Sequence, residues 1–215
     1  SDSVSTTLDN SSTGEFSMSG VETLTVKSKD SGNVNTVDLT TVSGLSTLIL
    51  TDDSGDGDDT TVKDVGTTTV KVGDSTNDLS GHVLTFDGGT ASGGESLDVD
   101  LVNTNNAQST LTISTDAYET LNLGLDDSSQ DHKINLDNTN ADNNGSVVIT
   151  GDNAAADLEL TGVEAGFQTI NATGLAGKLT MDATVLQSSV TYDIDGGSND
   201  DTLGMVNATS NIAGG

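Results

Sequence analysis

Two acidic stretches that contain glycine carry the residue types that bind a hard metal ion. DIDGGSNDDTL spans residues 193–203, and DDSGDGDD spans residues 52–59. Ca²⁺ takes oxygen ligands from carboxylates and backbone carbonyls, which such turns can supply together. The predicted metal ligands are Asp193, Asp195, Gly196, Gly197, Asn199, Asp200 and Asp201 in the first stretch and Asp52, Asp53, Asp56, Asp58 and Asp59 in the second.

The two stretches are expected to act differently. In the first, we expect the glycines to adopt positive φ so that carbonyls point inward, with Asn199 and Asp200 contributing their backbone carbonyls. In the second, the closely spaced carboxylates would repel one another without a counterion. The flanking helices and the terminal Glu of an EF-hand are missing there. A solvated acidic loop therefore remains the alternative for the second stretch.

The charge balance excludes several classes of partner. The chain has 34 acidic and six basic residues and a net charge of −28. No basic surface for nucleic acid or an anionic membrane can be assembled from it. No apolar run is long enough for a transmembrane helix, so direct membrane insertion is not expected. Self-repulsion on this scale favours a protein neutralised by Ca²⁺, although acidity that serves only solubility is the alternative.

Catalytic signatures are lacking, and the chain is not expected to be an enzyme. His82 and His132 are the only histidines; neither belongs to a metal-ligand motif, and both are expected at the surface. The sequence has no G-x-S-x-G elbow and no P-loop. Paired carboxylates could serve a glycosidase, but sugar clefts usually use aromatic platforms, and this chain has three Phe, two Tyr and no Trp.

Short phrases with period-two alternation recur along the chain and predict strands with one buried face. The phrases are GVETLTV (20–26), GLSTLIL (44–50), GTTTVKV (66–72), QSTLTI (108–113), AYETLNL (117–123) and GFQTINA (166–172). The first three place Thr23, Thr47 and Thr69 at nearly even intervals, whereas the interval from Thr120 to Thr169 is about twice as long. Repetition at this spacing predicts an all-β, irregular parallel β-solenoid with protruding loops.

A solenoid also accounts for the composition, since its core is a thin column that needs few apolar residues. Hydrophobic residues make up 32% of the chain, and Pro and Cys are absent. Tandem antiparallel β-sandwiches are the alternative fold, because strands with frequent turns fit both. We expect an irregular solenoid over residues 1–190 and a different, calcium-binding turn over 191–215.

The stretch GGSNDDTL (196–203) resembles the nonapeptide GGxGxDxUx of RTX proteins, in which two nonapeptides form one turn of a calcium β-roll. Gly196, Gly197, Asp201 and Leu203 match this pattern, and Asn199 replaces its third glycine. The spacing from Gly196-Gly197 to Gly214-Gly215 equals two nonapeptides. The intervening GMVNATSNI (204–212) lacks the motif. The glycine pair at the end is interpreted as the start of a next, truncated turn of a longer chain.

The recurrent strands, the acidity and the lack of Cys resemble RTX-type surface-layer (S-layer) proteins of Gram-negative bacteria. The resemblance implies a secreted structural protein, exported by type I secretion, that folds on binding Ca²⁺ and self-associates into a lattice on the cell surface. Outer-membrane lipopolysaccharide, bound through another part of the full protein, is a further expected partner. The alternative is a stalk or ligand-binding segment of a secreted RTX adhesin.

Overall fold

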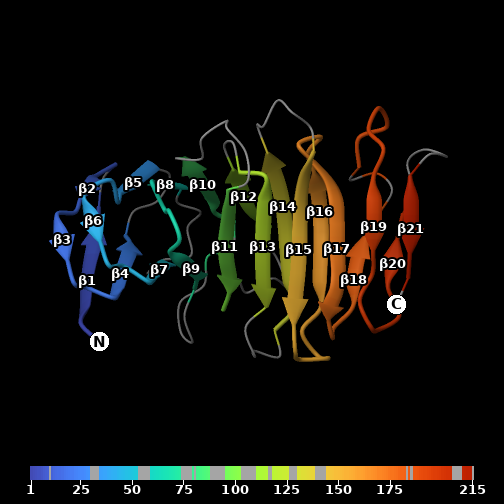
Figure 1. The fold of residues 1–215 in the computed structure, drawn as a ribbon, viewed down its shortest axis with the longest axis horizontal. Helices are drawn as coiled ribbons and strands as arrows, with labels where there is room; N and C mark the ends of the chain where they lie inside the picture. Colours follow the sequence, from blue (N-terminus) through green and yellow to red (C-terminus); the bar gives the residue numbers. More distant parts are fainter. Residues whose placement is uncertain are drawn as a thin grey trace.

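The computed structural model describes residues 1–9, 11–29, 34–52, 59–73, 79, 81–87, 95–102, 110–115, 118–125, 130–138, 144–182, 184, 186–204 and 210–214. Within these residues the chain forms strands and contains no α-helix. No helix of the described part is therefore long and apolar enough to cross a membrane. All strand pairs are parallel, and the strands stack along one axis (Figure 1).

Two long sheets build the fold, and successive strands of the chain alternate between them. Sheet A consists of β1 (Ser3–Leu8), β4 (Thr23–Ser28), β7 (Thr47–Asp52), β9 (Thr69–Val72), β11 (Ser96–Leu101), β13 (Thr120–Leu125), β15 (Gly145–Gly151), β17 (Phe167–Leu175), β19 (Asp193–Asp195) and β21 (Asn211–Ala213). Sheet B consists of β2 (Thr13–Glu15), β5 (Val34–Asp38), β8 (Asp59–Lys63), β10 (Val83–Asp87), β12 (Leu111–Thr115), β14 (His132–Asn138), β16 (Leu158–Val163), β18 (Leu179–Met181) and β20 (Thr202–Leu203).

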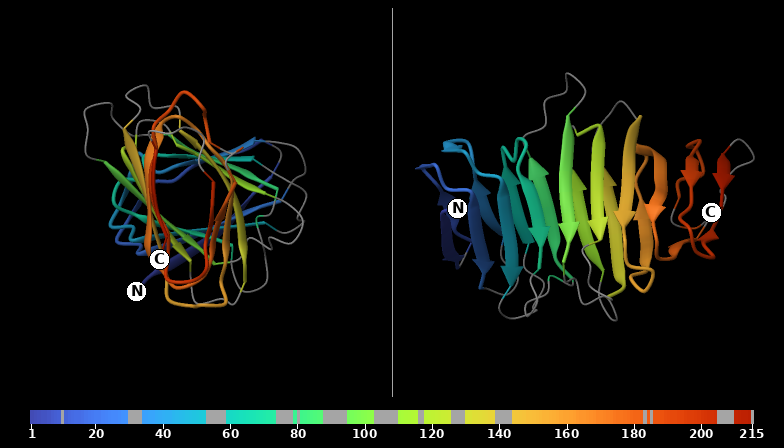
Figure 2. Two further views of the ribbon diagram at one scale, coloured as in Figure 1. Left: turned by 90° about the vertical axis from the view of Figure 1, so that its right-hand side faces the viewer. Right: turned by 60° about the horizontal axis from the view of Figure 1, so that its bottom comes forward.

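A third, two-stranded sheet pairs β3 (Met18–Ser19) with β6 (Val42–Ser43) near the N-terminal end. Each rung of the stack thus contributes one strand to each long sheet, and the rungs lie one behind another around a common axis when viewed along the stack (Figure 2). This arrangement is a parallel β-solenoid and confirms the predicted fold class. Tandem antiparallel sandwiches are excluded because every strand pair in the described residues is parallel.

The core is a column of aliphatic side chains between the two sheets, because alternate residues of each strand point inward. One inward file of sheet A is formed by Leu24, Leu48, Val70, Val99, Leu123 and Ile149, which pair in register from rung to rung. Each of these side chains is buried. A narrow column of this kind explains how a chain with so few apolar residues can still fold.

The recurrent Glu-Thr step marks the point at which sheet A strands begin. The Glu22 carbonyl accepts hydrogen bonds from both Ser46 and Thr47 N–H of the next rung, at 3.0 Å each. The Glu95 carbonyl likewise accepts from Glu119 and Thr120 N–H, at 3.2 Å each. The strand start is therefore fixed by one carbonyl that serves two amides of the following rung.

The irregular spacing of the phrases has a simple structural cause. Thr120 pairs with Ser146, and Ser146 pairs with Thr169, so the long interval between the two threonines consists of two rungs. The phrase QSTLTI supplies β12 of sheet B, whereas the other phrases supply strands of sheet A.

In the last rung, Asp195 of β19 pairs with Ala213 of β21. Fewer residues separate these two than separate any other paired residues of neighbouring rungs, so the last rung is the shortest of the stack. Gly196 and Gly214 each follow one member of this pair. The spacing between the two glycines therefore corresponds to one turn of the solenoid.

Candidate cation sites

The turn after β19 contacts the two neighbouring rungs. The Gly196 N–H donates to the Ala213 carbonyl at 2.7 Å in the next rung. The Ser198 N–H donates to the Leu175 carbonyl at 3.0 Å in the previous rung. The turn is therefore held between rungs by backbone hydrogen bonds. Leu203, at the end of the turn, is partly buried and packs against the core.

Close packing, and not positive φ, explains the two glycines of this turn. Neither Gly196 nor Gly197 has positive φ, which corrects the expectation from the sequence. A Cβ at Gly196 would lie 2.2 Å from Oδ2 of Asp201. A Cβ at Gly197 would lie 2.6 Å from the Leu175 carbonyl oxygen and 3.3 Å from those of Ala172 and Gly177. Only glycine leaves room for these oxygen atoms.

Asp201 is the predicted ligand with the most distinctive surroundings. Its Oδ1 accepts a hydrogen bond from the Leu179 N–H at 2.8 Å. Its Oδ2 is buried against Gly196 and has no hydrogen-bond partner in the described part of the chain. The register of β18 and β20 places Asp201 beside Leu179, in a file that points into the core. A carboxylate oxygen is thus buried without a donor.

The other predicted residues of this stretch do not converge on Asp201. Asp193 is exposed and Asp195 half-buried, on the outer face of β19 on either side of the buried Ile194. The Asn199 side-chain amide donates to the Ala154 carbonyl at 3.4 Å. Asp200 is exposed and, with Asn199, lines an open hollow of about 420 Å³ that also includes Asp157 and Lys178. Among the described residues, no three acidic or histidine side chains are grouped to hold a metal.

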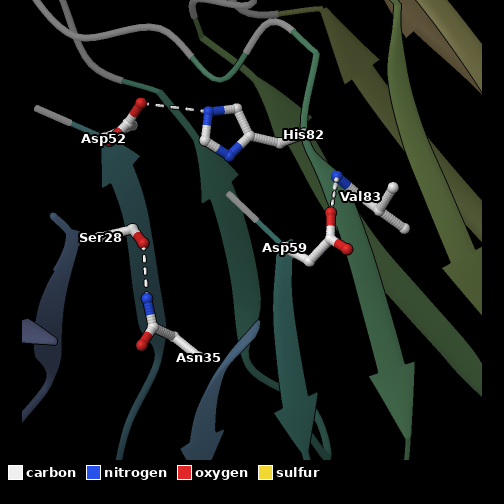
Figure 3. A network of polar contacts seen from close by, with 6 residues as sticks. All are labelled: Ser28, Asn35, Asp52, Asp59, His82 and Val83. Carbon is white, nitrogen blue, oxygen red and sulfur yellow. Dashed lines mark hydrogen bonds and ion pairs between the residues drawn. The ribbon is translucent and has the colours of Figure 1, made fainter. Parts of the chain in front are cut away.

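The second acidic stretch is described only at its two ends, since Asp53, Asp56 and Asp58 lie outside the described residues. Asp52 is in polar contact with His82, with 3.2 Å between Oδ2 and Nε2 and both side chains fully buried (Figure 3). Asp59 accepts a hydrogen bond from the Val83 N–H at 3.2 Å (Figure 3). Both aspartates thus already have partners within the protein.

Both histidines are buried, which corrects the expectation that they lie at the surface. The alternation of inward-facing and outward-facing residues along each strand could have predicted this burial from the sequence. His82 has the same parity as Leu84 and Phe86, and His132 has the same parity as Ile134 and Leu136. Because alternate residues share a face, both imidazoles had to point inward.

The electrostatics of the chain are dominated by burial and by negative charge. Burial lowers the pKa of His132 from 6.5 to about 4, against the opposing influence of Asp131. Burial also raises the pKa of Tyr118 to about 12, and Glu95, Asp64 and Asp87 add to this shift. The hydroxyl of Thr40 donates to Asp38 and lowers the pKa of that exposed carboxyl.

Several acidic side chains connect one rung to the next through backbone amides, a role that the sequence did not reveal. Asp157 accepts from the Lys178 N–H at 2.8 Å, and Glu119 accepts from the Glu95 N–H at 2.9 Å. Asp131 accepts from the Asp157 N–H at 3.3 Å. Part of the acidity is therefore structural, because these carboxylates satisfy amides at strand starts. Comparison of the chain with protein-family models, curated proteins and solved structures gives no match.

Proposed function

We propose that this chain is a structural segment of a secreted bacterial S-layer protein, in which bound Ca²⁺ stabilises the solenoid and lets copies assemble into a cell-surface lattice. The observation that carries the proposal is Asp201, whose buried Oδ2 has no hydrogen-bond donor among the described residues. Burying a carboxylate oxygen without a partner is unfavourable. A hard cation supplies such a partner, and backbone carbonyls close to Gly197 offer the same kind of ligand atom.

The overall charge supports a cation requirement. Two lysines form ion pairs: Nζ of Lys71 lies 3.9 Å from Oδ2 of Asp100, and Nζ of Lys133 lies 3.2 Å from Oε1 of Glu159. Six basic residues cannot neutralise 34 acidic ones. Divalent cations are the efficient way to reduce the remaining repulsion, and ions that bind the folded chain more tightly than the unfolded chain stabilise it by linkage.

The solenoid itself supports a structural role. Each rung contacts mainly its neighbours, so the fold is a stiff, elongated unit whose backbone arrangement repeats from rung to rung. The strands of each long sheet therefore follow one another along one outer face of the stack. Such a surface suits lateral packing against other copies in a regular array.

Calorimetric titration with Ca²⁺ tests the cation site. We expect the Asp201→Asn variant to bind Ca²⁺ more weakly than the wild type, since it removes the charge next to Gly196. Asp152→Asn is the matched control because it makes the same charge change at an exposed position. Equal weakening in the two variants would assign the effect to net charge and reject Asp201 as a ligand.

Electron microscopy of the protein after addition of Ca²⁺ tests assembly. Two-dimensional arrays are the expected result. Monomers that persist over a wide range of protein and Ca²⁺ concentrations would reject the lattice and favour a stalk of an adhesin.

A further inference from the structure

The solenoid has an open edge at its N-terminal end, where β1 of sheet A pairs with β4 on one side (Figure 1). No strand of the described residues pairs with the other side of β1. In sheet B, β2 likewise pairs with β5 alone. An edge strand presents a row of N–H and C=O groups that can bind a further strand. This end of the stack is therefore a candidate interaction surface.

The edge strand β1 lacks the features that usually prevent such pairing. Proteins protect exposed edges with Lys or Pro residues, with inward-pointing charges or with β-bulges. The sequence of β1, SVSTTL, contains no charged residue and no proline. Its six residues pair with β4 in unbroken register, so no bulge bends the strand away. On a molecule with a net charge of −28, β1 is thus a regular and neutral edge.

The apolar core is uncovered at the same edge. Val4 pairs with Leu24 in an inward file of sheet A, yet its side chain is 37% exposed, whereas Leu24 is fully buried. The other exposed large hydrophobic residue of the described chain, Val34, faces outward in β5. Thr6 and Leu8 lie on the same face of β1 as Val4. A strand that pairs with β1 would cover Val4, as the neighbouring rungs cover Leu24.

We propose that β1 is a self-association site, at which a second copy of this chain pairs its own β1 in antiparallel orientation about a two-fold axis. Such a contact uses the same patch on both copies, so the assembly closes as a dimer. The pairing continues sheet A from one copy into the other, as an extension of the contacts that join the rungs. Because both facing strands are uncharged, no like charges meet within the new strand pair. The strand β21 at the opposite end matches β1 less well, since it has three residues against six.

The alternation of β1 limits the register of this pairing. Residues directly opposite each other in an antiparallel pair point to the same face, so inward residues must lie opposite inward residues. When the two-fold axis passes through Thr6, Val4 of each copy lies opposite Leu8 of the other, and Ser5 lies opposite Thr7. We expect this register because it brings the two apolar residues of the strand together.

Analytical ultracentrifugation over a wide range of protein concentrations tests the dimer. The buffer contains Mg²⁺ in place of Ca²⁺ and enough salt to screen the net charge, so the proposed calcium-driven lattice does not contribute and its failure would leave this result unchanged. We expect a monomer–dimer equilibrium without larger species. Val4→Lys, which places a charge on the inward face of the edge, is expected to lose the dimer. Ser5→Lys makes the same charge change on the outward face and should still dimerise.

A single cysteine at position 6 tests the register, since the chain has no cysteine of its own. Thr6 lies on the proposed axis and faces its copy across the strand pair, at a separation that suits a disulfide. We expect Thr6→Cys to form a disulfide-linked dimer on oxidation, whereas Ala213→Cys in β21 should not.

A wild type that stays monomeric at every concentration would overturn the proposal, as would a series of growing oligomers, which would indicate contacts between opposite ends. A Thr6→Cys protein that does not cross-link, or a Val4→Lys variant that dimerises like the wild type, would also contradict it. Circular dichroism checks that each variant keeps the strand signal of the wild type. The wild-type equilibrium and the cross-linking decide the question even if Val4→Lys does not fold.

Discussion

His132 occupies a position in sheet B that its neighbours fill with leucine. It pairs with Leu158, which in turn pairs with Leu179, so the imidazole points into the core. Its pKa of about 4 in the folded chain lies below the value of 6.5 expected for the unfolded chain. The unfolded chain therefore binds more protons between these two values. The contribution of His132 to stability is complete above pH 6.5 and is lost as the pH falls towards 4.

Thermal melting between pH 4 and 7 tests the role of His132. In the wild type, protonation of this residue is expected to remove up to about 3 kcal/mol of stability across that range. His132→Leu removes the titrating group, so its melting temperature should fall less steeply with decreasing pH. The carboxylates titrate in both proteins, so their effect on the melting temperature cancels when the two proteins are compared. Parallel curves for the two proteins would contradict the account.

Gly196 and Gly214 follow the paired residues Asp195 and Ala213, one turn apart, and provide a matched pair of substitutions. At Gly196 a Cβ would lie 2.2 Å from Asp201 Oδ2, whereas at Gly214 nothing lies within 4 Å. We expect Gly196→Ala to cost about 1–3 kcal/mol, the range for overpacking. That cost should lower the melting temperature by several degrees, while Gly214→Ala should have little effect. Similar losses in both variants would argue against the close approach of Asp201.

At the scale of elements, the Asp52–His82 pair joins β7 to the segment that precedes β10. Removing one partner leaves the other polar side chain buried without this contact, which typically costs about 1–3 kcal/mol. Replacing both with apolar residues avoids that penalty. We therefore expect His82→Leu to be less stable in chemical denaturation than the double variant Asp52→Leu/His82→Leu. A double variant that is no more stable than His82→Leu would show that the pair is not coupled.

The positions of many strands could be predicted from the sequence, because the alternation of apolar and polar residues is a local pattern. Thr23, Thr47 and Thr69 were expected one rung apart, and they pair in register in β4, β7 and β9. The long interval between Thr120 and Thr169 could not be divided in advance, because loop lengths vary and Ser146 lacks the Glu-Thr step. QSTLTI has the same local pattern but belongs to the other sheet, and a pattern within one strand carries no information about which sheet it joins.

The candidate site was less predictable than the strands. Composition pointed to carboxylates in turns, and Asp201 does lie against Gly196. Composition could not show that Asp59 and Asp157 accept backbone N–H groups of later strands. Those contacts depend on how one rung stacks on the next, which a single stretch of sequence does not specify. The same holds for the pairing of Asp52 with the distant His82.

At the scale of the whole molecule, a thin apolar column supports a chain with a net charge of −28. Each rung packs against the rungs before and after it. The free energy of unfolding is therefore approximately the sum of contributions from the single rungs and from the interfaces between them. Carboxylates that accept backbone amides offset part of the repulsion, and the proposed Ca²⁺ would offset more. We therefore expect the folded chain to be least stable when divalent cations are removed.

Thermal unfolding followed by circular dichroism, with Ca²⁺ and then with a chelator at the same ionic strength, tests this claim most directly. Mg²⁺ at the same concentration is the control for general screening of charge. We expect the melting temperature to be highest with Ca²⁺, lower with Mg²⁺ and lowest with the chelator, where the strand signal should also be weakest. Identical spectra and melting temperatures under the three conditions would contradict the account.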